Sequence, residues 1–308
     1  GLTVVERALA ALPEEVAVRL GAGIGGVAYR PLRIRRGTVE RQLRAAFPGR
    51  PERWVRAVAR ACYRHFGREA VATLRIGRAG PPALLERLVN PEEPAATYER
   101  CASAGGGALV VTGHLGNWEL AGACLAALGL PVTAVVRRRE TGAERRLAEL
   151  RERLGIESVP MSAAPGRLRA ALAEGRTVAL VADQHAAARG IAVPFLGRPA
   201  STFLGPARLA LALRAPLFFG ALLREGSAYR AVLRPIPAPE PGRGAERELT
   251  RRWVAVLEEA VRDHPEQYFW FHRRWKLAEG TGGGRNASGS PVVAGSGRTR
   301  TGQDDEEP

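Results

Sequence analysis

Cysteine is scarce in this chain of 308 residues. The three cysteines, Cys62, Cys101 and Cys124, are widely spaced, and no two of them form a Cys-x-x-Cys pair. The sequence therefore predicts neither a zinc site nor a disulfide framework, and we expect small buried side chains in a reducing compartment. No other spacing of metal ligands stands out, so we expect the protein to work without a metal or cofactor.

Long apolar runs are missing as well. Charged residues such as Glu6, Arg7 and Arg19 interrupt the N-terminal segment before it reaches the length of a signal-peptide core. No run approaches the roughly 20 apolar residues that a helix needs to cross a bilayer. The sequence thus predicts contact with a membrane from one side, or no membrane contact.

Acidic residues are fewer than basic residues, and nearly all of the basic residues are arginine. Lysine and arginine number 46 against 31 aspartates and glutamates, a net charge of +15, and Lys276 is the only lysine. Such a charge favours an anionic partner, which leaves nucleic acid, acidic lipid headgroups and phosphorylated substrates as classes to weigh. A hydrophobic fraction of 45% excludes a disordered chain.

Residues 1–100 are expected to be mostly helical. Between residues 52 and 76, apolar side chains recur every three or four positions, which predicts an amphipathic helix. The apolar segment 2–30 is followed by the basic cluster Arg33, Arg35 and Arg36. This arrangement fits an interfacial membrane anchor, and equally a core helix with a solvated basic loop.

Residues 101–278 show a different pattern, in which short apolar runs alternate with helical segments. Strands are predicted over residues 108–112, 131–136, 177–182 and 216–223, and helices over 117–128, 143–154, 167–173, 203–213 and 249–261. This alternation predicts an α/β fold with a largely parallel central sheet flanked by helices. Residues 279–308 lack apolar side chains, and we expect them to form a disordered tail.

Three of the predicted strands end in polar residues. His114 follows the first strand, Arg137 the second, and Asp183 the third. Ligands of open α/β sheets bind beyond the carboxyl ends of the strands. If the sheet is parallel, an imidazole, a guanidinium and a carboxylate meet at one edge.

The segment Gly113-His-Leu-Gly-Asn-Trp-Glu119 carries the sharpest signal. His114 and Glu119 would lie about 140° apart on one continuous helix, but they can meet if His114 lies in a turn. A carboxylate on one imidazole nitrogen fixes the tautomer, so that the other nitrogen can take a proton from a hydroxyl. Asn117 is a candidate helix cap. The spacing alone is also compatible with a structural histidine near a helix start.

This segment resembles the His-x4-acid motif of the bacterial lipid A biosynthesis acyltransferases, a family that includes phosphatidylinositol mannoside acyltransferases. Three further blocks occur in the family's order, and the resemblance covers about residues 20–278. They are Phe47-Pro48, then Asp183 with Val193–Gly197 and Ala200–Thr202, and finally Pro265–Lys276. Two positions depart from the family's pattern: His185 stands where a second aspartate is common, and Arg138 where proline is usual.

The resemblance implies a glycerolipid-acyltransferase-like fold and transfer of a fatty acyl chain from an acyl-carrier-protein or coenzyme A thioester. The acceptor would be a hydroxyl of a lipid A precursor, or of a phosphatidylinositol mannoside or other glycolipid. His114 would be the general base and Glu119 its partner. Substrate-binding roles would fall to Arg137, Asp183, Asn117, Arg273, Arg274 and Lys276. The enzyme would make peripheral contact with the cytoplasmic face of the inner membrane.

Two alternatives compete with this interpretation. The charge and the tryptophans of Trp270–Trp275 would also suit a nucleic-acid-binding protein, but the basic residues are spread over the whole chain and no nucleic-acid motif appears. We therefore expect no nucleic-acid partner. A family member that has lost catalysis is disfavoured because His114 and Glu119 are present. Trp118, Phe195, Leu196 and Phe203 are candidates for an acyl groove or for core packing.

Overall fold

The computed structural model describes residues 7–9, 11–101, 106–136 and 141–276. Within them, six strands form one sheet in the order β3-β2-β4-β1-β7-β8. The strands are β1 (Ala108–Thr112), β2 (Val132–Val136), β3 (Ile156–Pro160), β4 (Thr177–Val181), β7 (Leu217–Glu225) and β8 (Ala228–Ile236). All neighbours are parallel except the hairpin of β7 and β8, so the predicted largely parallel α/β sheet is confirmed.

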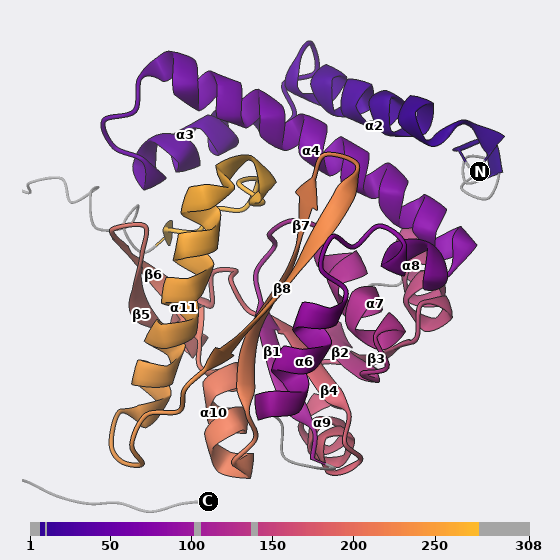
Figure 1. Cartoon of the computed structure of the whole chain (residues 1–308). Helices are drawn as coiled ribbons and strands as arrows, with labels where there is room; N and C mark the ends of the chain where they lie inside the picture. The colour runs from indigo at the N-terminus through magenta and orange to yellow at the C-terminus, as the bar shows by residue number, and fades with distance from the viewer. Residues whose placement is uncertain (1–6, 10, 102–105, 137–140, 277–308) are drawn as a thin grey trace, which may run out of the picture.

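Helices cover both faces of the sheet (Figure 1). Alternate residues of β1 point to opposite faces, so Leu109 and Val111 enter one apolar core and Val110 the other. The first core lies under α9 (Ala164–Ala173), α10 (Gly205–Leu213) and α11 (Ala245–Asp263). The second lies under α5 (Pro82–Leu85), α6 (Glu92–Cys101), α7 (Trp118–Ala127) and α8 (Gly142–Arg153).

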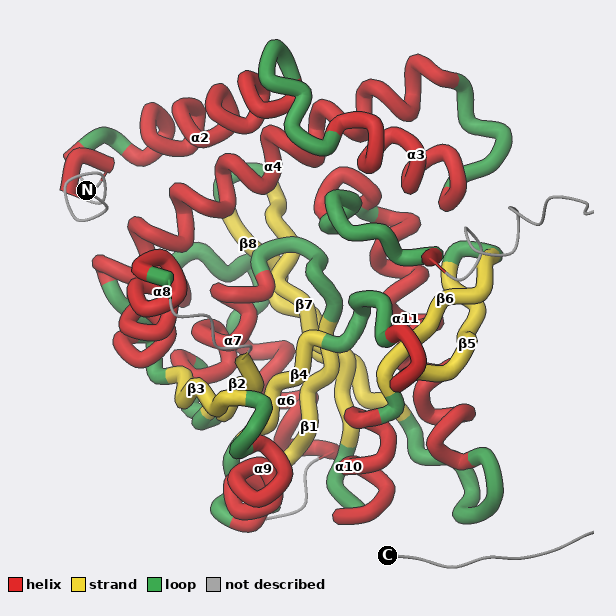
Figure 2. The backbone as a smooth tube through the Cα atoms, turned by 180° about the vertical axis from the view of Figure 1, so that it is seen from behind, coloured by secondary structure: helices red, strands yellow, loops and turns green. Residues whose placement is uncertain are grey.

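A two-stranded antiparallel hairpin lies outside the main sheet, where β5 (Gly190–Phe195) pairs with β6 (Arg198–Phe203). It packs beside α11, as the view from behind shows (Figure 2). We expected none of β3, β5, β6 and β8. Strand β3 is a polar edge strand and β8 alternates apolar with charged residues, so neither forms the continuous apolar run that marks a buried strand.

The expected helical N-terminal region is confirmed by α2 (Glu14–Tyr29), α3 (Arg36–Ala46) and α4 (Glu52–Ala79). Helix α4 runs across the carboxyl ends of the parallel strands, and its residues Val55 and Cys62 join the same core as Leu109 of β1. The boundary that we expected near residue 100 stays a prediction, and the tail 279–308 lies outside the described residues. In the part that is described, no helix combines the length and apolarity required for a membrane span.

Helix α2 lies on α4 at very short range because glycines form the contact. A Cβ atom on Gly25 would come within 2.0 Å of the Tyr63 carbonyl oxygen, and one on Gly21 within 2.4 Å of the Gly67 carbonyl oxygen. Gly23, on the exposed side of α2, has no heavy atom within 4 Å of its Cβ position. The glycines therefore set how closely α2 approaches α4, and the apolar residues of the opposite face are left exposed.

This contact yields a matched pair of predictions. Gly25→Ala should lower the free energy of unfolding by about 1–3 kcal/mol, because the methyl group meets backbone that cannot move aside. Gly23→Ala should raise it by up to about 1 kcal/mol through helix propensity alone. Urea denaturation followed by circular dichroism measures both values, and equal effects of the two substitutions would contradict the glycine-mediated contact.

Candidate active site

A tight turn links β1 to α7 and carries His114. Gly116 has a φ of +61°, and a Cβ atom there would lie 2.1 Å from the Leu222 carbonyl oxygen of β7, so only glycine fits. The Gly116 backbone NH donates to the Gln267 carbonyl oxygen at 2.9 Å, and the Asn117 NH donates to that of Leu222 at 2.9 Å. The turn is thus held by backbone contacts on two sides.

Asn117 positions this turn from within the core. Its side chain caps α7 by accepting from the Leu120 NH at 3.0 Å, and its amide donates to Glu69 at 2.8 Å and to Thr73 at 2.9 Å. Glu69 also accepts from the Tyr229 hydroxyl at 2.8 Å and forms a buried ion pair with Arg224. We expected Asn117 to bind substrate; instead it is 4% exposed, with its polar atoms bound inside the protein.

His114 is held by Asp183, which follows strand β4. The imidazole Nδ1 lies 2.7 Å from Asp183 Oδ1, and the His114 backbone NH donates to Oδ2 at 2.9 Å. An ionised carboxylate can only accept, so Nδ1 carries the proton and Nε2 is left as the basic nitrogen. The Gln184 side-chain amide nitrogen lies 3.2 Å from Nε2, which fits an amide donating to that nitrogen.

The electrostatics of the pair follow from this geometry. Burial opposes the protonation of His114, but the charge of Asp183, its hydrogen bond and the charge of Glu119 outweigh burial, and the pKa of His114 is raised. Burial opposes the ionisation of Asp183, yet the charge of His114 and its two hydrogen bonds hold the pKa of the carboxyl below its usual range. Each partner therefore stabilises the charged form of the other: the carboxylate of Asp183 favours the imidazolium of His114, and the imidazolium favours the carboxylate.

The expected contact between Glu119 and His114 is wrong. Both carboxylate oxygens of Glu119 bind Arg151 of α8, at 2.6 Å to Nη2 and 2.8 Å to Nε. Asp183, which we expected to bind substrate, instead holds the imidazole with both carboxylate oxygens and takes the place expected for Glu119. A carboxylate five residues away in the sequence was the nearest candidate along the chain, whereas the actual partner reaches His114 through the pairing of β1 with β4.

The basic residues that we expected to bind substrate lie in different environments. Arg274 is 1% exposed, and its guanidinium donates to the Ser201 carbonyl at 2.6 Å and the Thr202 hydroxyl at 2.7 Å, so it braces the β5–β6 hairpin rather than facing substrate. Arg273 and Lys276 are exposed, and their substrate roles stay predictions. Arg137 lies outside the described residues.

Sequence reasoning missed several neighbours of His114. Trp118 and Phe269 pack against its ring at 4.8 and 5.8 Å between centroids. His272 accepts from the His185 backbone NH at 2.9 Å, and burial, with the nearby cations Lys276 and Arg274, lowers the pKa of His272 to about 4. The aromatic block that contains Phe269 and His272 stood out through its resemblance to the family and as a possible base-stacking stretch, but nothing in its spacing pointed to His114.

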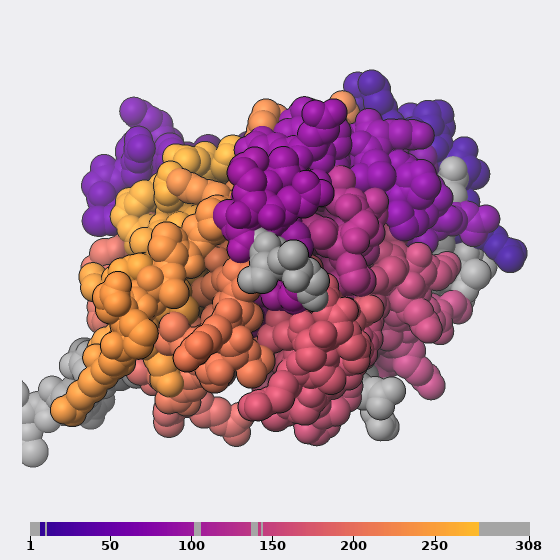
Figure 3. Space-filling view, turned by 60° about the horizontal axis from the view of Figure 1, so that its bottom comes forward, coloured from indigo at the N-terminus to yellow at the C-terminus, as the bar shows by residue number. Residues whose placement is uncertain are grey.

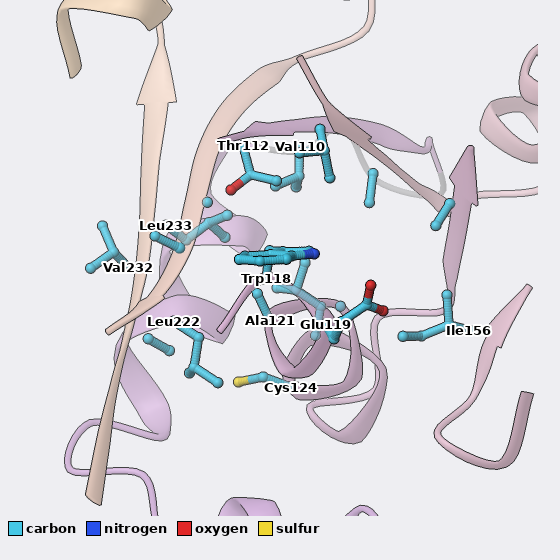
Figure 4. Close-up of a pocket in the computed structure, with 18 of the residues that line it drawn as sticks. Val110, Thr112, Trp118, Glu119, Ala121, Cys124, Ile156, Leu222, Val232 and Leu233 are labelled. Carbon is cyan, nitrogen blue, oxygen red and sulfur yellow. The ribbon is translucent and has the colours of Figure 1, made fainter. Parts of the chain in front are cut away.

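Two apolar spaces adjoin Trp118. The α4 groove, of about 440 Å³, lies between α4, α7 and α8, and its apolar walls include Phe66, Leu147 and Phe269. The α7 cavity, of about 90 Å³, lies between α7 and the sheet, where Val110, Ile156 and Leu233 line it (Figure 4). Trp118 and Glu119 border both spaces.

Of the expected acyl-groove residues, only Trp118 borders these spaces. Phe195 and Leu196 are core residues, 0% and 2% exposed, and Phe203 lines neither space.

A larger groove of about 960 Å³ lies between α10 and segment 235–246, on the side brought forward in Figure 3. It borders Pro216 and Leu217, at the amino end of β7, and is therefore remote from His114. Within the described ranges, no cluster of three or more His, Cys, Asp or Glu side chains is arranged to hold a metal ion.

The sequence profile of the bacterial lipid A biosynthesis acyltransferases matches residues 2–277. The chain belongs to this family. The match includes the turn with His114, the strand end with Asp183 and the C-terminal aromatic block.

Two of the curated relatives are phosphatidylinositol mannoside acyltransferases. The chain is 28% identical over 177 residues to a phosphatidylinositol mannoside acyltransferase of Mycolicibacterium smegmatis, an alignment that covers 56% of this chain and 58% of the relative. It is 28% identical over 178 residues to the phosphatidylinositol mannoside acyltransferase of Mycobacterium tuberculosis strain H37Rv, which covers 56% of each chain. The chain thus spans little more than half the length of the curated relatives it matches.

The contact between His114 and Asp183 can be tested without any substrate. Asp183→Asn removes the charge that raises the pKa of His114 but leaves the burial that lowers it. The charge of Glu119, which also raises the pKa of His114, stays in this variant, so the midpoint of the His114 titration, followed by NMR, should fall from its raised value. His114→Ala identifies the resonance by its loss. A midpoint that Asp183→Asn leaves unchanged would contradict the pairing.

Proposed function

We propose that the protein transfers a fatty acyl group from a thioester donor to a hydroxyl of a glycolipid. One observation carries the proposal: Asp183 holds the Nδ1 side of His114, which leaves Nε2 as a base. The same imidazole packs against Trp118 and Phe269, two walls of an apolar groove suited to lipid tails. Membership of the acyltransferase family supports the same reaction.

In the proposed reaction, Nε2 of His114 removes the proton from the acceptor hydroxyl as its oxygen attacks the thioester carbonyl carbon. The tetrahedral intermediate collapses with cleavage of the carbon–sulfur bond, and the leaving thiolate takes the proton back from the imidazolium. The charge of Asp183 stabilises the imidazolium between the two steps. Acceptor and donor thus react directly, with no acyl-enzyme.

The developing oxyanion needs hydrogen-bond donors. The His114 backbone NH is already bound to Asp183, and those of Gly116 and Asn117 are bound to carbonyl groups, so these donors are occupied. The Gln184 side-chain nitrogen lies 3.2 Å from Nε2 and carries two N–H groups. When the acceptor hydroxyl takes its place at Nε2, both groups are available, and we assign Gln184 the role of donor to the oxyanion.

The names of the relatives favour a phosphatidylinositol mannoside as the acceptor, whereas the family description favours a lipid A precursor. Both are glycolipids with sugar hydroxyls and lipid tails, and the same base serves either. The donor is an acyl-carrier-protein or coenzyme A thioester, both of which are anionic and complement the net charge of +15.

Helix α2 supplies the surface that we propose for membrane contact. Six of the nine large apolar side chains that are exposed in the described ranges lie between residues 16 and 34: Val16, Leu20, Ile24, Val27, Leu32 and Ile34. The first four form one stripe on α2, opposite the glycines that contact α4. We name these six residues the α2 apolar face.

The basic residues beside the α2 apolar face favour an anionic phospholipid surface as the partner of this face. Arg30, Arg33 and Arg35 are exposed in the loop after α2, and a basic residue near an anionic bilayer contributes about 1 kcal/mol. The loop is tied to the site, because the Arg35 guanidinium donates to the Phe271 carbonyl at 3.0 Å and Phe271 packs against Phe269. Because both thioester donors are cytoplasmic compounds, we place the protein on the cytoplasmic face of the inner membrane.

The proposed base predicts the outcome of one substitution. His114→Ala should lower the rate of acyl transfer by at least about 10²–10⁴-fold, because it removes the imidazole that takes the proton from the hydroxyl. The assay incubates the protein with acyl thioester and, in separate reactions, phosphatidylinositol mannoside or lipid A precursor, and weighs the lipids by mass spectrometry. His264→Ala, at the end of α11, is the matched control and should retain full activity. Normal turnover by His114→Ala would rule out the proposed base.

The α2 apolar face predicts a second outcome. Ile24→Asp should reduce co-sedimentation with phosphatidylglycerol-containing vesicles by about tenfold or more, because it removes apolar burial and adds a charge of the wrong sign. Met161→Asp, at a position of comparable exposure just before α9, should bind vesicles like the unmodified protein. Equal binding by all three proteins would exclude this face as the docking surface.

A further inference from the structure

Glu119 raises the pKa of His114 through its charge, but its carboxylate is bound to Arg151 and Asp183 takes the hydrogen bond to the imidazole. This ion pair is bidentate, because the Nε and Nη2 atoms of Arg151 each donate to one carboxylate oxygen of Glu119. The side chains are 19% and 14% exposed, so water screens the pair only in part. A bidentate pair of this kind fixes the relative orientation of its two helices.

The pair joins helix ends that favour its charges. Glu119 lies in the first turn of α7, where the helix dipole stabilises an anion, and Arg151 lies in the last turn of α8, where the dipole stabilises a cation. Helix α7 begins with Trp118, which packs against His114. The pair therefore ties α8 to the helix that starts at the proposed site.

Helix α8 is also a wall of the two apolar spaces. Its residues Leu147 and Leu150 line the α4 groove, and its Arg151 lines the α7 cavity. Leu150 packs onto α4 at Gly77, where a Cβ atom would lie 1.8 Å from the Leu150 Cδ1 atom. One side of α8 is thus anchored on α4 and the other on Glu119, at the place where the groove and the cavity adjoin.

We propose that Glu119 and Arg151 form a latch that holds α8 against α7 and so sets the shape of the acyl-binding space beside His114. Glu119 is then a positioning residue that acts through Arg151 and does not share in the proton transfer. This inference rests on the proposed acyl transfer. It assigns Arg151 a role that neither the spacing of the motif nor the comparisons indicate.

A charge reversal tests the latch. Glu119→Gln and Arg151→Met should each raise the KM for a long-chain acyl thioester about tenfold or more, while kcat changes much less. The reversed pair, Glu119→Arg with Arg151→Glu, should recover most of the loss. Recovery is expected to be incomplete because each charge then sits at the unfavourable end of its helix. A carboxylate that assists His114 would instead lower kcat, and the reversed pair would be as inactive as Glu119→Gln.

A neutral double variant covers the case in which the reversed pair does not fold. For a latch, Glu119→Gln with Arg151→Met should be no worse than the poorer single variant, because the second change removes a partner already lost. Losses that multiply would overturn the latch, and so would an Arg151→Met variant with unchanged KM. Absence of transfer by the unmodified protein would instead refute the proposed function, so the two failures are distinguishable.

Discussion

The proposed chemistry depends on one contact, the hydrogen bond between His114 and Asp183, and that contact depends on the register of two strands. Thr112 of β1 lies opposite Val181 of β4 in a parallel pair, so the two chains leave the sheet side by side. The Ala182 NH donates to the Thr112 carbonyl at 3.0 Å, which extends the pairing by one residue. Beyond this point, the first side chain after β1 is the imidazole of His114, and the first after Ala182 is the carboxylate of Asp183. A shift of one residue in either strand would turn one of them to the other face.

Burying the charged carboxylate of Asp183 in this position costs free energy. Asp183 is only 2% exposed, and a buried charge is tolerated only when hydrogen bonds and opposite charge replace water. The backbone and side chain of His114 supply two of these bonds. The turn that presents them is fixed in turn by Gly116 against β7 and by Asn117 in the buried network with Glu69 and Arg224. The core network of α4 and β7 therefore contributes to the geometry of the base without touching it.

The sequence predicted the edge of the sheet at which His114 and Asp183 lie, but not the contact between them. Apolar runs located β1, β2, β4 and β7, and the rule for open α/β sheets then placed His114 and Asp183 at the same edge. The choice of Glu119 as partner failed because spacing along the chain reports only local neighbours. His114 and Asp183 are 69 residues apart, and only the strand register, which the sequence does not display, brings them together. Arg274 was misjudged for a related reason, since a charged residue in an exposed-looking block can be buried by a hairpin that the pattern did not reveal.

The most direct measurement of the central claim is a double-mutant cycle on acyl transfer with His114→Ala, Asp183→Ala and both together. Residues that act as one unit are strongly non-additive, because the carboxylate has nothing to orient once the imidazole is gone. We expect Asp183→Ala to lower the rate strongly in the unmodified protein and to have almost no further effect in the His114→Ala background. Rate losses that multiply in the double variant would show that the two side chains work separately, and would contradict the account.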